Sequence, residues 1–255
     1  MLIVLSPAKR LDFTEADPGL PASERRFLED TASLARTARA RTVSELRQLM
    51  SISDDLARLN RERFQAFEAE STDGVQAAFA FAGDVYEGLK ARELDAAGLA
   101  FAQEHLRILS GLYGLLRPLD RIQPYRLEMG TRLKTRRGSS LYDFWGDRIA
   151  KQLNADAEGD GRRTLVNLAS QEYFGAVDAR ALKLPVVTPH FRESRDGESR
   201  IISFFAKKAR GGMARFAIDE RIERAEDLKA FDRDGYRFDK AASSDTDWIF
   251  IRSGN

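Results

Sequence analysis

The spacing of apolar and polar positions along the chain predicts a protein that mixes strands with helices. Short apolar runs bounded by turn residues predict strands at 2–5, 106–109, 164–169, 186–191, 200–205, 236–238 and 248–251. Apolar residues that recur every three or four positions predict helices at 21–40, after Thr42, after Ser53, and at 140–155, 171–177 and 207–222. The uniformly apolar stretch 75–82 fits either a helix or a strand.

Several boundaries carry capping or turn signals. Thr42 followed by Glu45 is a capping box, and Ser53 and Ser140 stand where N-caps are expected. Asp-Gly at 196–197 predicts a hairpin turn. The buried face of the helix after Ser53 is expected to hold Leu56, Leu59, Phe64 and Phe67. The strand–helix–strand order across 164–191 predicts a parallel crossover, whereas the last third of the chain is expected to be mostly antiparallel.

These elements predict an α+β (mixed α/β) fold, with one compact domain over residues 1–255 and a mixed sheet flanked by helices. Apolar residues make up 43% and charged residues 32%, which suits a globular protein with a sizeable core. No repeat or Pro/Ser-rich linker divides the chain. The apolar run at the start is too short for a signal peptide or a membrane span, so we expect a cytoplasmic protein.

Metal and thiol chemistry are constrained by composition. The chain has no cysteine and only two histidines, His105 and His190. These counts exclude disulfides, iron–sulfur clusters and cysteine-ligated zinc, and disfavour a histidine-rich iron site. We therefore expect no metal and no cofactor, although an all-carboxylate site stays open.

Charge is unevenly placed. The net charge is only +1, from 41 Lys and Arg against 40 Asp and Glu. Residues 117–137 nevertheless carry seven basic residues against two acidic ones, and residues 200–215 carry five basic residues and no acidic one. Clusters of Lys and Arg bind nucleic acid by releasing counterions from phosphates. The same blocks are also compatible with ordinary solvated surface.

The second basic block contains a pair of adjacent glycines. In a helix over 207–222, Lys208, Gly212 and Arg215 share one face, with Lys207 and Gly211 beside them. Glycine costs roughly 1 kcal/mol in a helix interior, so close approach of a sugar-phosphate backbone, or tight packing on a strand, is expected there. Free N–H groups near 205–208 would add an anion site.

Several phrases in the chain resemble those of a known family. They are Leu5-Ser6-Pro7-Ala8-Lys9, Gly83-Asp84-Val85-Tyr86-Glu87-Gly88-Leu89, the run from Leu106-Arg107-Ile108-Leu109-Ser110-Gly111 to Arg117-Pro118-Leu119-Asp120, Gln123-Pro124-Tyr125-Arg126-Leu127-Glu128-Met129-Gly130, Leu141-Tyr142-Asp143-Phe144-Trp145-Gly146-Asp147, Asn167-Leu168-Ala169-Ser170-Gln171-Glu172-Tyr173-Phe174, and Ile201-Ile202-Ser203-Phe204-Phe205-Ala206-Lys207-Lys208-Ala209-Arg210-Gly211. In this order they resemble the bacterial YaaA family, also called UPF0246 or DUF328, over nearly the whole chain.

The resemblance implies a cytosolic bacterial protein of the peroxide-stress response, linked to keeping free intracellular iron low. It also implies DNA binding, a fold specific to the family, a basic cleft and a helix-hairpin-helix element. The segment 109–114 is only loosely similar to such a hairpin, since Ser110 replaces its proline.

Candidate site residues follow from both lines of reasoning. The residues expected to bind nucleic acid are Lys9, Arg117, Arg121, Arg126, Arg132, Lys134, Lys207, Lys208, Arg210 and Arg215. Tyr113 and Tyr125 flank Arg117 and Arg121 and are candidates for stacking on an unpaired base. Asp84, Asp143 and Glu172 are candidates for acid–base chemistry. A structural role at an element end is favoured for each, and Asp143 suits a helix cap at Ser140.

We expect a monomer that binds double-stranded or branched DNA through its backbone. One alternative is an enzyme acting on nucleic acid or a nucleotide, with a glycosylase-like or base-modifying reaction. A second is a stress adaptor that lowers free iron through a protein partner.

Overall fold

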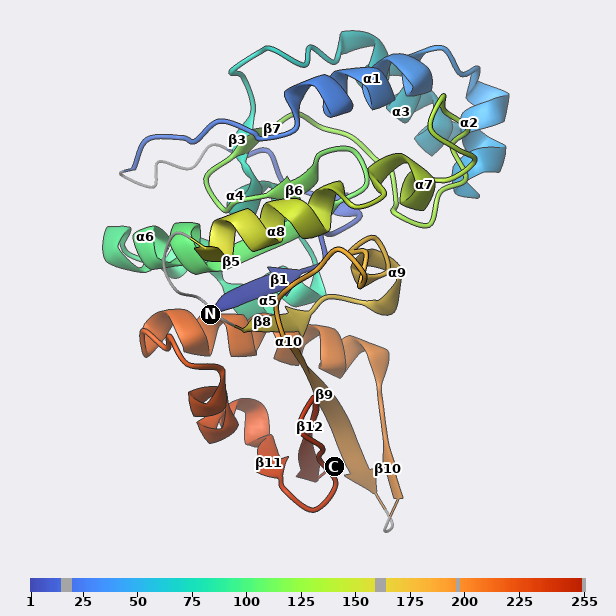
Figure 1. Ribbon diagram of the computed structural model, residues 1–255. Helices are drawn as coiled ribbons and strands as arrows, with labels where there is room; N and C mark the ends of the chain where they lie inside the picture. Colours follow the sequence, from blue (N-terminus) through green and yellow to red (C-terminus); the bar gives the residue numbers. More distant parts are fainter. Residues whose placement is uncertain (15–19, 159–163, 196–197, 254–255) are drawn as a thin grey trace.

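A mixed sheet runs through the middle of the molecule (Figure 1). The computed structural model describes residues 1–14, 20–158, 164–195 and 198–253. The eight-stranded sheet has the order β11-β12-β9-β8-β1-β5-β6, with β10 paired to β9. Its strands are β1 (Leu2–Leu5), β5 (Leu106–Ser110), β6 (Gly114–Leu116), β8 (Leu165–Leu168), β9 (Val186–Arg195), β10 (Glu198–Arg200), β11 (Arg237–Asp239) and β12 (Asp247–Ser253).

The centre of the sheet is parallel. β1 pairs in parallel with β5 on one side and with β8 on the other, and β8 pairs in parallel with β9. β1, β5 and β8 are buried along their whole length. Such strands, covered on both faces, read as continuous apolar runs, and for this reason the runs at 2–5, 106–109 and 164–169 were correctly predicted as strands.

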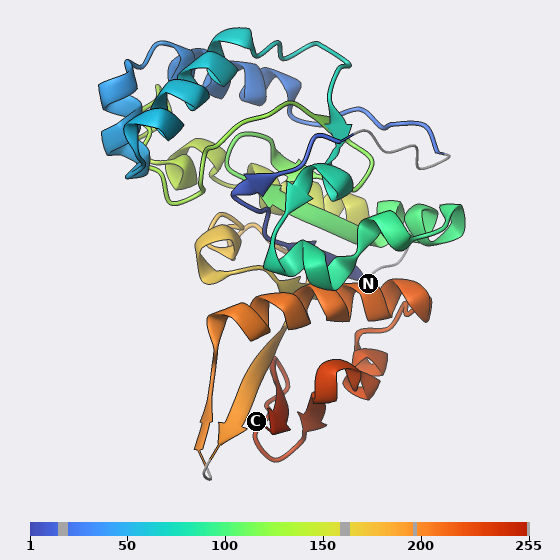
Figure 2. The ribbon, with the colours of Figure 1, turned by 180° about the vertical axis from the view of Figure 1, so that it is seen from behind.

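Helices cover both faces of the sheet (Figures 1 and 2). α8 lies over one face and α5, α6 and α10 over the other, while α1, α2, α3 and α7 form a layer beyond β6. The helices are α1 (Leu28–Arg39), α2 (Val43–Met50), α3 (Asp54–Ala66), α4 (Ala77–Ala80), α5 (Asp84–Leu89), α6 (Ala96–His105), α7 (Leu141–Trp145), α8 (Arg148–Glu158), α9 (Gln171–Phe174) and α10 (Ser203–Asp219), with short 3-10 turns at Ala91–Glu93, Ala225–Ala230 and Arg233–Gly235. These elements confirm the α+β class.

Two small pairs of strands flank the sheet. β2 (Arg10–Leu11) pairs with β4 (Phe81–Ala82), and β3 (Val75–Gln76) pairs with β7 (Arg121–Ile122). Residues 75–82 are therefore strand, helix and strand in turn. No helix in the described part of the chain is long and apolar enough to cross a membrane.

The helix caps were predicted more accurately than the helix lengths. Thr42 and Glu45 form the capping box of α2, and Ser53 and Ser140 cap α3 and α7. The single helix expected at 140–155 is wrong, because Gly146 with φ +51° ends α7 before α8 begins.

Two apolar patterns near the N-terminus were also misread. α1 begins at Leu28, well after the expected start at 21, because Ser23 is held to Asp120 by a bridge and a 2.5 Å hydrogen bond. On α3, Leu56 and Leu59 are 38% and 39% exposed, so only Phe64 and Phe67 of the expected face are buried.

The last third of the chain corrects one further expectation. β10 ends at Arg200 and α10 already begins at Ser203, so the strand at 200–205 is wrong beyond its first residue. Ile201 and Phe204 are 53% and 49% exposed. As expected, β9 pairs antiparallel with β10, and β11 with β12, and β12 also pairs in parallel with β9. The turn predicted at 196–197 lies outside the described residues.

One glycine of the pair in α10, Gly211, is explained by a neighbouring helix. A Cβ on Gly211 would lie 1.7 Å from the Val85 carbonyl oxygen of α5, and a Cβ on Gly88 would lie 2.1 Å from the Lys208 carbonyl oxygen. The close approach is therefore helix on helix, in place of the nucleic acid or strand expected. α10 begins at Ser203 and its first helical bond is donated by the Ala206 N–H, so its free N–H groups lie at 203–205 and reach only the first residue of the expected 205–208.

Candidate functional site

The parallel strands of the sheet create a topological switch point. From β1 the chain continues to β5 on one side, whereas from β8 it continues to β9 on the other side. Loops that leave the carboxyl ends of two such strands diverge, and ligands of open α/β sheets bind in the space between them. The carboxyl ends of β1 and β8 are therefore where the fold itself points to a site.

Two serines meet at this point. Ser6 follows β1 and Ser170 follows β8. The Ser6 hydroxyl donates to the Ser170 hydroxyl at 3.3 Å, and the Ser170 N–H donates to the Ser6 hydroxyl at 2.9 Å. Ser170 also caps the short helix α9 by accepting from the Tyr173 N–H. Both serines are partly exposed, so the hydroxyl pair is within reach of solvent.

The loop 125–130 closes one side of the switch point. Lys9 forms an ion pair of 2.6 Å with Glu128, and Arg126 donates to the same carboxylate at 2.9 Å. The Gly130 N–H donates to the Glu172 carboxylate at 2.9 Å. These contacts join the loop after β1 and the helix after β8 to the loop 125–130. The charged residues around the switch point are called the switch-point rim below: Lys9, Arg126, Glu128 and Glu172 on this side, and Asp84 and Lys207 on the other.

Helices α5 and α10 close the other side. A Cβ built on Gly83 would meet Ala8 at 3.5 Å, so the start of α5 lies beside the loop after β1. The Tyr86 hydroxyl donates to the Ser6 carbonyl oxygen at 3.2 Å. Lys207 of α10 lies 3.6 Å from Asp84 at the start of α5.

Tyrosine hydroxyls form the inner part of this site. Tyr125 shares a 2.6 Å hydrogen bond with Ser110 at the end of β5. Burial raises the pKa of Tyr86, Tyr125 and Tyr173 well above the ordinary tyrosine value, and Glu172 and Glu128 raise the pKa of Tyr173 further. All three hydroxyls therefore stay neutral at physiological pH and keep the capacity to donate a hydrogen bond.

About half of the predicted nucleic-acid residues are engaged elsewhere. Arg117 is held by Asp120 and the Glu24 carbonyl, Arg121 by the Gly74 carbonyl, and Arg215 by Asp219 and the Lys90 carbonyl. Arg210 is partly buried, and this burial lowers its pKa. These four side chains stabilise the fold, so the structure offers little support for them as phosphate ligands.

The remaining predicted residues fall into two neighbouring groups. Lys9, Arg126 and Lys207 belong to the rim of the switch point, where each is paired with a carboxylate. Lys208 lies one residue further along α10 and forms no side-chain ion pair or hydrogen bond with any described residue.

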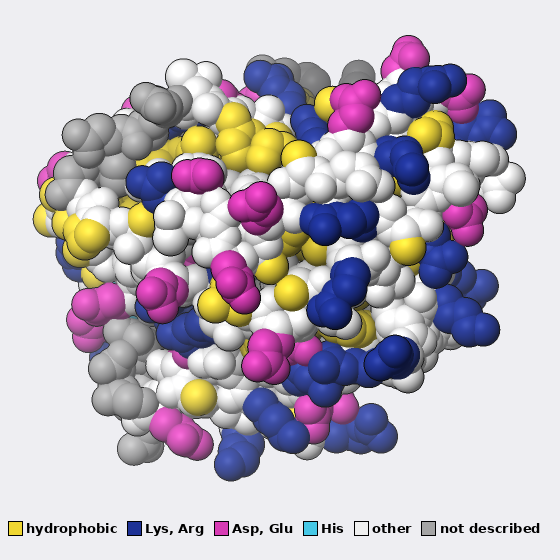
Figure 3. Space-filling view, turned by 90° about the horizontal axis from the view of Figure 1, so that it is seen from above, with side chains coloured by type: hydrophobic (Ala, Val, Ile, Leu, Met, Phe, Trp, Pro, Cys, Tyr) yellow, Lys and Arg dark blue, Asp and Glu magenta, His cyan; other side chains and the backbone are white. Residues whose placement is uncertain are grey.

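The second group is a surface loop, 131–138, that continues directly from Gly130 and is called the basic loop below. Arg132, Lys134 and Arg136 are exposed on it and have no ion-pair or hydrogen-bond partner among the described residues. Arg137 anchors the loop to α1 by an ion pair with Asp30, and to α7 by its position 4.5 Å over the Phe144 ring. Figure 3 shows Lys and Arg side chains gathering on the side of the upper face where this part of the fold lies.

Two expectations drawn from aromatic and hairpin patterns are wrong. Tyr113 and Tyr125 are 1% and 5% exposed and pack edge to face, so neither ring is available to stack on a base. The segment 109–114 joins β5 to β6 in an antiparallel pair, so it is not a helix-hairpin-helix element.

The three candidate acids lie in two different settings. Asp143 completes the capping box of α7, and hydrogen bonds from Ser140 and Ser139 lower its pKa. Asp84 and Glu172 instead lie on the switch-point rim. Within the described part of the chain, no three His, Cys, Asp or Glu residues stand close enough together to hold a metal ion.

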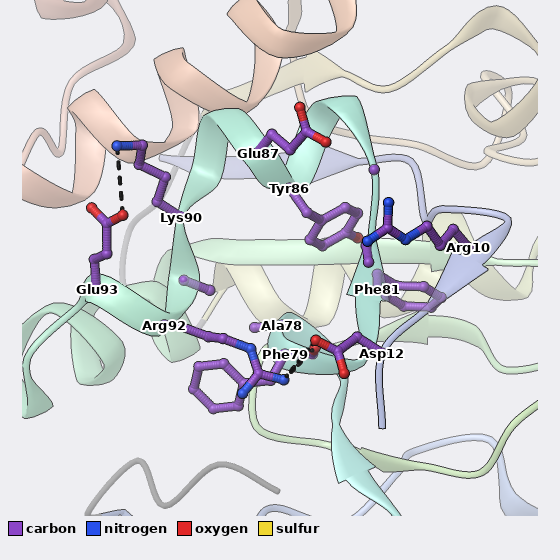
Figure 4. Close-up of a pocket in the computed structure, with 13 residues that line it drawn as sticks. Arg10, Asp12, Ala78, Phe79, Phe81, Tyr86, Glu87, Lys90, Arg92 and Glu93 are labelled. Atoms are coloured by element: carbon purple, nitrogen blue, oxygen red, sulfur yellow. Dashed lines mark hydrogen bonds and ion pairs between the residues drawn. The ribbon is translucent and has the colours of Figure 1, made fainter. Parts of the chain in front are cut away.

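A separate pocket of about 190 Å³ opens between β2, β4 and α5 (Figure 4). Phe79 and Phe81 lie at its floor. Its charged lining is balanced, with Arg10, Lys90 and Arg92 facing Asp12, Glu87 and Glu93. Arg92 is held by Asp12 at 3.4 Å and lies over the Phe79 ring. This pocket differs from the basic cleft expected from the resemblance, and that cleft stays a prediction.

Sequence reasoning missed Ser6, Glu128, Ser170 and Tyr173 as site residues. A signal was present, because each lies in one of the phrases that carry the family resemblance. What those phrases share is visible only in the fold: the segments after β1 and β8, the loop 125–130 and the start of α5 meet at one edge of the sheet.

Sheet and rim together define an α/β protein with a polar site at the switch point and a basic loop beside it. The chain belongs to the YaaA family, since the family model described as peroxide stress protein YaaA matches residues 1–242. A UPF0246 protein of Phenylobacterium zucineum is 63% identical over 252 residues, which cover 99% of this chain and 95% of the relative. UPF0246 proteins of Caulobacter vibrioides and Ruegeria pomeroyi are 62% and 55% identical, each over 99% of this chain, covering 99% and 98% of the relative.

Proposed function

We propose that this protein binds DNA in the peroxide-stress response, gripping the sugar-phosphate backbone with the basic loop that adjoins the switch-point rim. The observation that carries the proposal is the basic loop, where Arg132, Lys134 and Arg136 are exposed, close in sequence and without acidic partners among the described residues. Uncompensated cations of this kind release counterions from phosphates. We expect distorted or branched DNA to be preferred, because the rim adjoins the loop and offers further polar groups.

The chemistry of peroxide gives such binding a purpose. Ferrous iron reacting with peroxide makes hydroxyl radicals that attack DNA, so a protein on the backbone is well placed to protect or mark a lesion. We further propose that the protein lowers free iron, as the family resemblance implies. A variant that cannot bind DNA but still lowers free iron in peroxide-treated cells would separate the two roles.

A charge-reversal pair tests DNA binding directly. The variant Arg132→Glu, Lys134→Glu, Arg136→Glu reverses the basic loop. Its matched control, Arg224→Glu, Arg237→Glu, Lys240→Glu, reverses three exposed cations that also lack side-chain partners among the described residues. The control residues lie around β11, at the opposite end of the molecule (Figure 1).

Fluorescence anisotropy with labelled duplex, single-stranded and four-way-junction DNA is the readout. Both variants change the net charge equally, so a general electrostatic effect would weaken both alike. We expect the loop variant to lose binding to every DNA form at moderate salt, and the control to stay close to the parent. Equal binding by all three proteins would refute the assignment of the loop.

A further inference from the structure

The switch point has hydrogen-bonding capacity that the fold does not use. Because Ser6 donates to Ser170, the Ser170 hydroxyl proton has no acceptor among the described residues. The Met129 backbone lowers the pKa of Tyr173, and the Tyr173 hydroxyl proton has no acceptor in the same described part of the chain. Two hydroxyl donors without acceptors, Ser170 and Tyr173, thus belong to the segment that follows β8.

The charges around these donors cancel locally. Lys9 and Arg126 share Glu128, and Lys207 faces Asp84. A bare phosphate or another small anion would gain little from such a balanced rim, since each cation already has a carboxylate partner. A neutral planar group that carries both donors and acceptors matches it better, and a nucleobase edge is such a group.

The basic loop connects this neutral site to the proposed DNA surface. The loop starts immediately after Gly130, whose N–H is bonded to Glu172, the residue before Tyr173. A DNA strand held by Arg132 and Lys134 therefore passes beside the switch point. Lys9, with 63% of its side chain exposed, is placed to exchange Glu128 for the phosphate of an entering nucleotide.

We propose that the switch point binds the base of a single unpaired nucleotide through Ser6, Ser170 and Tyr173. This proposal rests on the proposed DNA binding and adds a defined position for one nucleotide. Enzymes that act on a base in a duplex, or read it, take that base out of the stack and hold it by its hydrogen-bonding edge. Glu128 and Glu172 rim the same site, so an extruded nucleotide would meet carboxylates as well as hydroxyls.

The test uses DNA containing 2-aminopurine, whose fluorescence rises when the base leaves the stack. Two substrates are compared: a duplex with 2-aminopurine opposite an abasic site, and a fully paired duplex. Anisotropy of a second, terminal label reports binding independently. Tyr173→Phe removes one hydroxyl of the site, with Ser6→Ala as a second site variant. Tyr142→Phe is the control, because its hydroxyl is already committed to the Glu172 carbonyl at 2.9 Å.

We expect the parent protein to raise the 2-aminopurine signal several-fold opposite the abasic site. Tyr173→Phe and Ser6→Ala should lose most of that rise while their Kd stays within about threefold of the parent, and Tyr142→Phe should keep both. Suppression of the rise by free adenosine monophosphate, with anisotropy unchanged, would support the site and extend it to free nucleotides.

Three results would overturn the proposal in distinguishable ways. Binding by anisotropy with no fluorescence rise from either substrate would refute the nucleotide site alone. No binding to either DNA at low salt would refute DNA binding and the nucleotide site together. An equal fluorescence rise for parent, Tyr173→Phe and Ser6→Ala would place base extrusion elsewhere on the protein.

Discussion

The neighbouring glycines of α10 should respond to alanine in opposite directions. Gly211 faces α5, where an added Cβ would stand 1.7 Å from the Val85 carbonyl oxygen and 2.8 Å from the Leu89 nitrogen. Gly212 faces away from that contact, and the nearest atom to its added Cβ is the tip of Phe231 at an ordinary 3.8 Å. The two positions share the same helix interior, so each is the other's control.

The expected changes in the free energy of unfolding follow from two effects, the flexibility of the unfolded chain and the packing of the added methyl group. Replacing glycine by alanine inside a helix stabilises by roughly 0.5–1 kcal/mol, because the unfolded chain loses flexibility. Overpacking costs typically 1–3 kcal/mol, and at Gly211 the obstruction is backbone that cannot rotate aside, which favours the upper end. We therefore expect Gly211→Ala to destabilise by about 2 kcal/mol and Gly212→Ala to stabilise by about 0.5–1 kcal/mol.

Equilibrium unfolding in urea, followed by circular dichroism, measures both changes on the same scale. The slope of the unfolding free energy against urea concentration must be the same in parent and variants, because only then does a shift in the midpoint report a change in stability. If Gly211→Ala proved as stable as the parent, α5 and α10 would not cross at Gly88 and Gly211, and our explanation of Gly211 would be wrong.

Three other predictions follow from the structure. The pKa of each of the six tyrosines is raised, for Tyr113 to about 12, so the absorbance rise at 295 nm should come at a higher pH in the folded protein than in the unfolded chain. Stability should fall above about pH 10, where the unfolded state ionises first, and reversible titration of several tyrosines near pH 10 in folded protein would contradict this. Asp143→Asn should lower the Tm at neutral pH and leave it unchanged at strongly acidic pH, because a carboxylate with a lowered pKa stabilises only while it is ionised; an equal loss at both pH values would argue against the capping role. Lys207→Glu, Lys208→Glu should weaken DNA binding in anisotropy less than reversal of the basic loop does, because Lys207 is already paired with Asp84; a larger effect would move the centre of the interface to α10.

Local features of the fold were predictable from sequence because local physics determines them. Buried parallel strands read as apolar runs, and Thr42, Ser53 and Ser140 were recognised as caps because a cap needs only its own helix start. The break at Gly146 was missed because helical periodicity continues across it into α8. The early start of α10 was missed because Phe204 and Phe205 read equally well as strand, and only the observed exposure of Phe204 separates the two.

The candidate site was less predictable because it depends on strand order. Ser6 and Ser170 are 164 positions apart and meet only because β1 and β8 are neighbours. Clustering of Lys and Arg indicated a basic surface but did not distinguish the exposed Arg132 from Arg117, which Asp120 and the Glu24 carbonyl hold. Tyr113 and Tyr125 stand beside arginines in sequence, yet their rings turn into the core.

The salt dependence of DNA binding tests the central claim most directly. For duplex DNA, log Kd changes with log salt concentration by about 0.9 for each phosphate neutralised. Replacing Arg132, Lys134 and Arg136 together by alanine should therefore reduce the slope of the parent protein by about 2.7. A reduction of that size would establish the basic loop as a phosphate-binding surface, and an unchanged slope would show that DNA, if bound at all, is held elsewhere.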